Sequence, residues 1–127
     1  MIPKFRAWHK TREELGEVER IRFDDEGNVS TVLVIGKSFG ANIYIDKIEL
    51  MQSTGLKDKN GQEIFEGDIL GTKDGLLNGV VEYRSDLGMW TNSLIKYNNF
   101  ERLCNVATSR EIIGNIYENP ELLEEKE

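Results

Sequence analysis

The sequence has few of the side chains on which enzyme and metal sites depend. It contains one cysteine, Cys104, and one histidine, His9. A single cysteine forms no intramolecular disulfide and no multi-thiolate metal site, so Cys104 is expected to act as a small buried hydrophobic residue. His9 has no second histidine at metal-ligand spacing and no thiolate nearby, and a surface position is expected for it. We therefore predict no catalytic residue, no metal site and no cofactor.

Long apolar segments are missing as well. The first twelve residues carry charges with no apolar stretch behind them, which argues against a signal peptide. The longest apolar run, Val32–Ile35, is far shorter than the roughly 20 residues that span a bilayer. We expect a cytoplasmic protein without a membrane partner. Its 127 residues, 39% of them hydrophobic and 31% charged, are enough for a folded domain with a real core.

Negative charge dominates the chain, whose net charge is −7, yet the first twelve residues contain four cations and no acid. With the tryptophan among them, these cations are candidate nucleic-acid contacts: Lys4, Arg6, Trp8, Lys10 and Arg12. Neutralisation of phosphates supplies most non-specific binding to nucleic acid, so an acidic chain has no overall attraction for it. The alternation of Phe5 and Ala7 with charged neighbours also fits a strand with one buried face, and we favour that structural interpretation.

Strand patterns fill the first half of the chain. Arg20–Phe23 alternates, which places Ile21 and Phe23 inward, and the turn that follows contains Gly27. Segments rich in β-branched residues continue the pattern. The extended segments are predicted at 4–8, 20–23, 29–35, 43–45 and 48–51. Between residues 11 and 19 a short helical turn is expected, although Gly16 weakens it.

The second half of the chain has the pattern of a β-meander, in which successive strands pair antiparallel. A turn-rich connector over 54–61 is followed by four segments about ten residues apart, which predicts a small antiparallel barrel-like unit of the SH3-like kind. These strands are predicted at 68–72, 79–84, 89–94 and 111–118, and the core residues expected from them are Ile69, Val81, Trp90, Ile112 and Ile116. Asn119 and Pro120 then predict the start of a short C-terminal helix.

The predicted fold class is thus mainly β, with an N-terminal β extension, a barrel-like unit and a short C-terminal helix. We expect one domain over residues 1–127. Its parts are the extension at 1–53, the barrel-like unit at 54–118 and a short acidic helical tail at 119–127.

Three short patterns invite a chemical interpretation. Gly36-Lys37-Ser38 is similar to the end of a phosphate-binding loop, but the upstream glycine is replaced by Thr31 and no strand-to-helix context is present. Residues 58–63 alternate oxygen-bearing side chains as calcium loops do, yet the glycine comes too early, and a hairpin turn is favoured. The carboxylates of Glu63, Glu66 and Asp68 cluster in sequence, which leaves a hydrolase open as the weakest hypothesis.

Several segments together resemble the YopX family of small phage and prophage proteins. The matching stretches, which span nearly the whole chain, are Lys4–Trp8, Leu50–Gly61, Glu63–Leu70, Gly79–Tyr83 and Ile113–Leu123. The resemblance implies a phage-derived protein in the cytoplasm of a bacterial host cell, a mostly β fold and oligomerisation. It implies no activity, because the family has no established biochemical role and no assigned catalytic residues.

These observations rank three functions. The first is a non-enzymatic protein-interaction module, a homo-oligomer that acts on a host or phage protein. The alternative is a nucleic-acid-associated phage factor that uses the basic N-terminal arm. A hydrolase using the three clustered carboxylates comes last. Salt dependence separates the first two, since phosphate binding weakens steeply with ionic strength and an apolar interface hardly responds.

Overall fold

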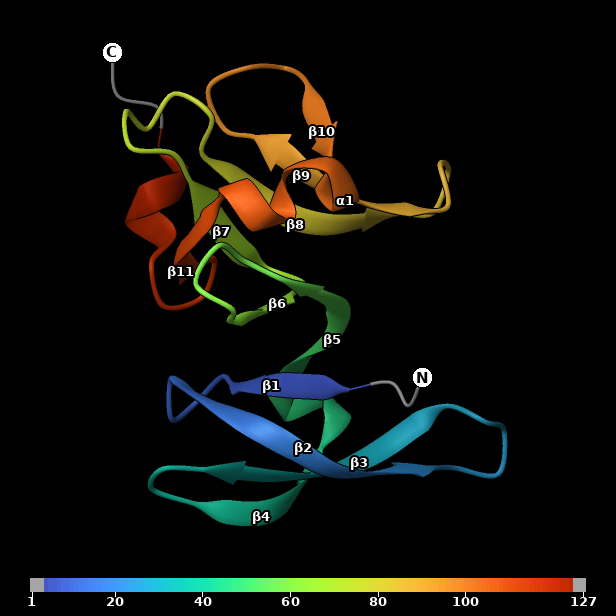
Figure 1. Cartoon of the computed structure of the whole chain (residues 1–127). Helices are drawn as coiled ribbons and strands as arrows, with labels where there is room; N and C mark the ends of the chain where they lie inside the picture. Colours follow the sequence, from blue (N-terminus) through green and yellow to red (C-terminus); the bar gives the residue numbers. More distant parts are fainter. Residues whose placement is uncertain (1–3, 125–127) are drawn as a thin grey trace. The chain divides into compact units, whose positions relative to one another are not determined.

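The structure is a computed structural model that describes residues 4–124, and most of them lie in antiparallel strands (Figure 1). The mainly β prediction is confirmed. The chain divides into two compact units, an N-terminal unit of residues 1–52 and a C-terminal unit of residues 53–127. The strand β5 (Ile48–Lys57) begins in the first unit and ends in the second.

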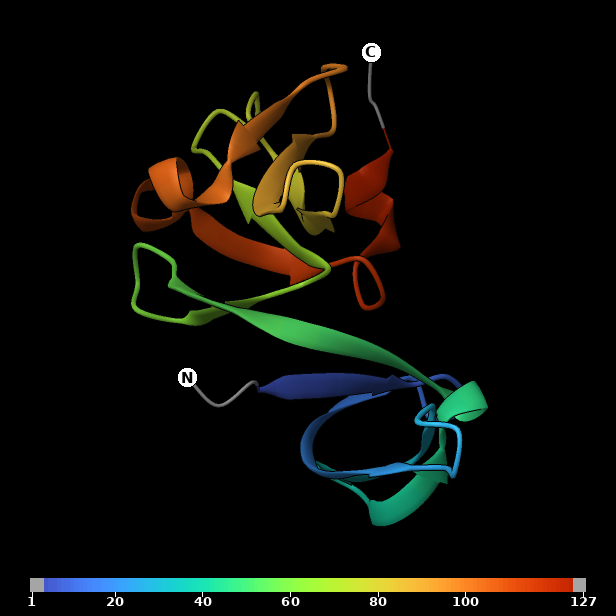
Figure 2. The same cartoon turned by 90° about the vertical axis from the view of Figure 1, so that its right-hand side faces the viewer.

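The N-terminal unit is a curled antiparallel sheet with the strand order β4-β3-β2-β1-β5 (Figure 2). Its core is aliphatic and consists of Ala7, Val32, Val34, Ile43 and Ile48. Besides β5, its elements are β1 (Phe5–His9), β2 (Glu14–Phe23), β3 (Val29–Gly36), β4 (Gly40–Tyr44) and the 3₁₀ turn η1 (Ile45–Lys47).

The helical turn predicted over 11–19 is wrong, because β2 begins at Glu14 and runs as a ten-residue strand. Gly16 explains the difference. It pairs with both Ala7 and Gly36, and a Cβ atom there would lie 2.4 Å from the Val34 side chain. The glycine that weakens a helix is thus the residue that lets Val34 pack against the sheet.

Phe23 was predicted to point inward and is 63% exposed. The β2–β3 ladder shifts register twice, between Val18 and Arg20 and again between Arg22 and Phe23. Such irregularities change which face a side chain occupies, and strict alternation cannot reveal them. Ile21 packs against the core as predicted, and Gly27 takes the left-handed φ of 87° expected for the turn.

The C-terminal unit contains a five-stranded antiparallel sheet with the order β10-β9-β8-β7-β11. The hydrophobic core lies against this sheet and includes Ile64, Leu70, Val81, Leu103 and Ala107. The elements of the unit besides β5 are β6 (Glu63–Phe65), β7 (Asp68–Gly71), β8 (Gly79–Arg84), β9 (Met89–Leu94), β10 (Phe100–Arg102), α1 (Leu103–Val106), the 3₁₀ turn η2 (Ala107–Ser109), β11 (Glu111–Asn115) and the 3₁₀ helix η3 (Pro120–Leu123).

Two of the five predicted core residues are fully buried. Ile69 and Val81 are 0% and 1% exposed, whereas Trp90 and Ile112 pack against the core while partly exposed, and Ile116 is also partly buried. Strands β8 and β9 have the predicted bounds.

Other boundaries differ from the prediction. Residues 54–57 continue β5 instead of forming a connector, and only Asp58–Gly61 turns. Strand β11 ends at Asn115, three residues early. The short C-terminal helix is present as η3, but Asn119 does not cap it: its side chain accepts the Asn115 N–H instead. The last three residues of the predicted tail lie outside the described residues.

Cys104 is exposed, so its predicted burial is wrong. Within α1, Leu103 faces the core and is 0% exposed, while Cys104 points away from it. Residues 96–106 showed no clear periodicity because this stretch holds a three-residue strand followed by one helical turn. Elements this short impose almost no pattern on the sequence.

A partly buried ion pair joins the end of the C-terminal sheet to the turn before β11. The guanidinium of Arg110, which is 7% exposed, donates to Glu101 in β10 with an Nη2–Oε2 distance of 2.8 Å. Asn92 of β9 donates to the same carboxylate at 3.0 Å. These hydrogen bonds, led by that from Arg110, hold the pKa of Glu101 below its usual range despite partial burial.

A second buried carboxylate closes the hairpin between β5 and β6. Asp58, 3% exposed, accepts the N–H groups of Asn60 and Gln62 through Oδ1 at 2.9 Å each and the N–H of Ile112 through Oδ2 at 3.0 Å. Gly61 completes the turn with a φ of 81°. Burial opposes ionisation of Asp58, but the three donors outweigh it and lower its pKa below the usual 3.8.

The Asp58→Ala change is expected to lower the free energy of unfolding by about 3 kcal/mol, because three backbone N–H groups lose a buried, charged acceptor. The lowered pKa means that the ionised carboxylate stabilises the fold above pH 3.8, and that this stabilisation is lost as pH falls through the folded-state pKa. Urea unfolding between pH 2 and pH 7 measures both effects. Asp25→Ala, in an exposed turn, is the control and should change stability little; equal losses for the two variants would contradict the assignment.

Candidate interaction surface

The five basic-arm candidates do not form one free cationic surface. Arg6 and Trp8 lie on β1, which is an inner strand of its sheet between β2 and β5. In this ladder Arg6 is opposite Glu17 and Met51, and Trp8 is opposite Leu15 and Glu49. Lys4 precedes the strand and is exposed. Of the five residues of β1 only Ala7 is buried, at 0%, and its neighbours on both sides are partly exposed.

Lys10 and Arg12 lie in the turn between β1 and β2, and both have partners within the N-terminal unit. The Lys10 Nζ atom is 3.3 Å from Glu49 Oε1 and donates to the Asp46 carbonyl at 3.2 Å. The Arg12 guanidinium lies over the Phe39 ring, 5.1 Å from its centroid. Exposed pairs of this kind are worth only ~0–1 kcal/mol, so a polyanion can displace them.

The clustered carboxylates of the C-terminal unit act as hydrogen-bond acceptors for their own fold. Glu63 accepts the Ser53 hydroxyl. Asp68 is 2% exposed and accepts the Phe65 N–H at 2.7 Å, which closes the turn between β6 and β7. Glu66 lies within that turn. A buried carboxylate that accepts a backbone donor is a turn-forming group, and this arrangement gives the hydrolase hypothesis no support.

One serine motif was not identified in the sequence analysis. Residues 36–40 read Gly-Lys-Ser-Phe-Gly, which matches the Gly-x-Ser-x-Gly pattern of nucleophile elbows. An elbow joins a strand to a helix, whereas Lys37 and Ser38 form the tight turn of the β3–β4 hairpin, closed by the hydrogen bond from the Gly36 N–H to the Phe39 carbonyl.

The partners of this serine also differ from those of a nucleophile. Ser38 Oγ donates to Glu14 at 2.6 Å, and the Ser38 N–H donates to the same carboxylate at 3.1 Å. These bonds hold the pKa of Glu14 below its usual range. His9 accepts the Arg12 N–H at Nδ1 and meets Phe39 edge to face. Within residues 4–124 no hydrogen bond joins Ser38 to His9. The bonds from Ser38 to Glu14 instead stabilise the β3–β4 hairpin.

Four strands lie at sheet edges in the described part of the chain: β4, β6, β10 and β11. Unpaired edges invite pairing with other chains, and proteins protect them with charge, shortness, proline or bulges. Strands β6 and β10 have three residues each and carry charged side chains, and β11 carries Glu111 and a register shift at Ile113.

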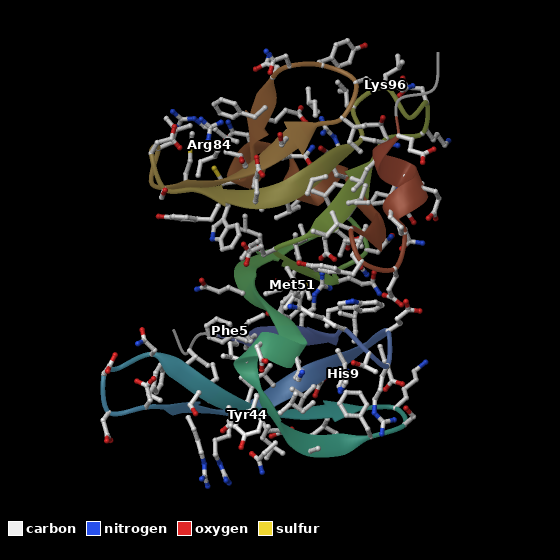
Figure 3. All side chains as sticks on the ribbon, turned by 180° about the vertical axis from the view of Figure 1, so that it is seen from behind. Phe5, His9, Tyr44, Met51, Arg84 and Lys96 are labelled. Atoms are coloured by element: carbon white, nitrogen blue, oxygen red, sulfur yellow. The ribbon has the colours of Figure 1, made fainter. Side chains whose placement is uncertain are left out.

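Strand β4 has none of these protections. Its five residues, Gly40-Ala41-Asn42-Ile43-Tyr44, include no charge and no proline, and four of them are exposed. The ladder with β3 runs without a register shift from Thr31–Tyr44 to Ile35–Gly40. Tyr44 is 68% exposed, and Figure 3 labels it on this strand. The free edge of β4 is therefore the candidate interaction surface.

The direction of each backbone group on β4 follows from the hairpin. The hydrogen bond between Gly36 and Phe39 makes these residues a hydrogen-bonded pair, and such pairs alternate along an antiparallel ladder. Ala41 and Ile43 therefore point their N–H and C=O groups at β3. The same groups of Gly40, Asn42 and Tyr44 point away from β3, to the free side.

Comparisons with known proteins identify the family to which this fold belongs. The YopX protein family model matches residues 4–124. The chain belongs to the YopX family. Protein EF1440 from Enterococcus faecalis, a crystal structure, is 32% identical, with a TM-score of 0.69 over 98% of this chain and 99% of that one. The yopX protein of Bacillus subtilis, also a crystal structure, is 20% identical, with a TM-score of 0.61 over 95% and 98% of the two chains, and shows the shared fold. No curated protein matches.

The segments that carried the YopX resemblance hold much of the buried polar architecture. The carboxylates of Asp58 and Asp68 accept backbone N–H groups, as described above. Asn115, 5% exposed, accepts the N–H groups of Tyr117 and Glu118 at 3.0 and 2.9 Å. These side chains shape turns, so the recognisable YopX motifs identify the fold. Among residues 4–124, no helix is long and apolar enough to cross a membrane.

The backbone directions on β4 lead to a paired prediction. Asn42→Pro removes an N–H that faces the free side, and an edge strand tolerates proline at such a position, so unfolding stability should change by less than about 1 kcal/mol. Ala41→Pro removes an N–H bonded to β3 and should cost about 3 kcal/mol. Thermal or urea unfolding of the two variants is the test. Similar losses in both would mean that the directions are assigned wrongly.

Proposed function

We propose that this YopX-family chain is a non-enzymatic protein-interaction module of phage or prophage origin, which acts in the cytoplasm of its bacterial host cell. Its docking surface is the free edge of β4. An extended segment of another polypeptide chain adds to this edge as a further strand, and backbone hydrogen bonds provide the affinity.

One observation carries the proposal: β4 is the uncharged and regular edge among the edges of the described sheets. The other edges are shortened, charged or bulged, as a protein that avoids aggregation requires. An edge without protection exposes three N–H and three C=O groups, and a partner strand satisfies them. Exposed Tyr44 and Ile35, at 68% and 42%, add apolar contact beside it.

Affinity capture from bacterial host cells, with the tagged wild-type chain and with Asn42→Pro, tests the proposal. Proline blocks the free side without disturbing β3, so the specific partner should be lost at least tenfold with the variant. Amide exchange on the purified complex should show protection at Gly40, Asn42 and Tyr44. Capture that is unchanged by Asn42→Pro, or rapid exchange at these amides in the complex, would refute it. Lys73→Pro, in an exposed loop of the C-terminal unit, is the control.

The nucleic-acid alternative has one observation in its favour. The N-terminal unit has eight Lys and Arg residues against nine Asp and Glu, a net charge of −1, whereas the C-terminal unit has eight against fourteen, or −6. The basic arm thus belongs to the less acidic half. Repulsion of a polyanion by this half is weaker than the total of −7 suggests.

We nevertheless expect weak nucleic-acid binding at physiological salt, because the basic arm supplies only four cations in a chain whose net charge is −7. A titration of labelled single- and double-stranded DNA and RNA at about 150 mM salt should give no submicromolar affinity. Submicromolar binding that disappears in the Lys4→Ala, Arg6→Ala double variant would instead put the nucleic-acid role first. Lys57→Ala, Lys59→Ala in the C-terminal unit is the matched double control.

A further inference from the structure

We infer that the occupant of the β4 edge is β4 of a second copy of this chain, paired antiparallel about a two-fold axis at Asn42. This inference rests on the proposed function, because it names the partner of the same edge. It is argued from the register, the side chains and the charge of β4.

The register follows from which backbone groups are free. Gly40, Asn42 and Tyr44 point their N–H and C=O groups outward, so a partner strand must bring its own outward residues opposite them. In a symmetric antiparallel pair, this happens over the full strand only when Asn42 faces Asn42 of the second copy. Gly40 then faces Tyr44 at each end. All three outward positions form hydrogen-bonded pairs, and shifting either way by one step loses a pair.

The side chains of β4 are complementary to themselves in this register. Each exposed Tyr44 ring lies over Gly40 of the other copy, where no side chain opposes it, and aromatic residues cover strand glycines well in this way. On the other face Ile43 meets Ala41, again a large residue opposite a small one. Because β4 has its large side chains at its C-terminal end and its glycine at its N-terminal end, it is complementary to an antiparallel copy of itself.

Charge also permits a second copy. A two-fold axis brings identical groups together, so a single charged residue at the centre of β4 would face its own like charge. The strand from Gly40 to Tyr44 carries none. The central pair, Asn42 with Asn42, offers an amide donor and an amide acceptor from each side and has no such repulsion.

Cysteine cross-linking tests the register. The variants are built on Cys104→Ser, because Cys104 is exposed and would react. In the inferred pair the two Asn42 Cα atoms are about 5.5 Å apart, within the range of a disulfide, whereas the two Gly40 Cα atoms are about 15 Å apart. Asn42→Cys should therefore give at least tenfold more disulfide-linked dimer than Gly40→Cys under mild oxidation.

A second arm does not depend on Asn42. Gly40→Cys and Tyr44→Cys should each stay unlinked alone, and a mixture of the two should cross-link because these positions face each other. Light scattering of the wild-type chain at micromolar concentration should exceed the monomer mass of 14.6 kDa. Circular dichroism checks that every variant is folded.

The results separate this inference from the proposed function. A monomeric chain whose Asn42→Cys variant does not cross-link overturns the inference. So does cross-linking of Gly40→Cys that equals that of Asn42→Cys, which indicates another register. If Asn42→Pro still abolishes capture of a host or phage protein in either case, the edge docks a different partner and the proposed function stands.

Discussion

The carboxylate of Asp58 connects parts of the C-terminal unit that are far apart in sequence. One oxygen holds the tight turn that follows β5, and the other accepts the Ile112 N–H, 54 residues away. The Lys59 N–H donates to the Arg110 carbonyl beside it. This places Arg110 where it pairs with Glu101, which in turn binds Asn92. The β5–β6 hairpin, strand β11 and the partly buried ion pair thus depend on one ionised side chain whose two oxygens both accept hydrogen bonds.

A side chain whose hydrogen-bonding capacity is used within the fold is less available to bind or react with a ligand. Buried polar groups that are fully hydrogen-bonded define a unique fold and leave little reactive chemistry over. Asp58, Asp68 and Asn115 are of this kind, and Glu14 and Ser38 do the same on the surface of the N-terminal unit. The buried polar side chains that could be mistaken for a catalytic or metal site accept hydrogen bonds from backbone N–H groups. An interaction role at a strand edge uses the backbone itself, and it needs no such residue.

The N-terminal unit also shows why that edge lies at β4. Glycines at positions 16 and 36 let β2 and β3 pack closely, and Glu14 fastens the turn that follows β3. Side-chain hydrogen bonds thus hold the β3–β4 turn, while the outer side of β4 pairs with no other strand of the described residues. A strand that is already ordered loses less conformational entropy when a partner strand adds to it than a disordered segment does.

The sequence by itself determined the class of fold, several strands and the family. Alternation of apolar and polar residues located β1, and the regular spacing of turn residues located β8 and β9. The YopX motifs are local turn chemistry that is visible in linear order. Tertiary structure alone decided the rest. Gly16 in a strand, the exposure of Phe23 and Cys104, and the acceptor role of Asn119 all depend on which segments meet. The free edge of β4 belongs here too, since an edge is a property of the assembled sheet: five uncharged residues have the same sequence whether or not another strand lies beside them.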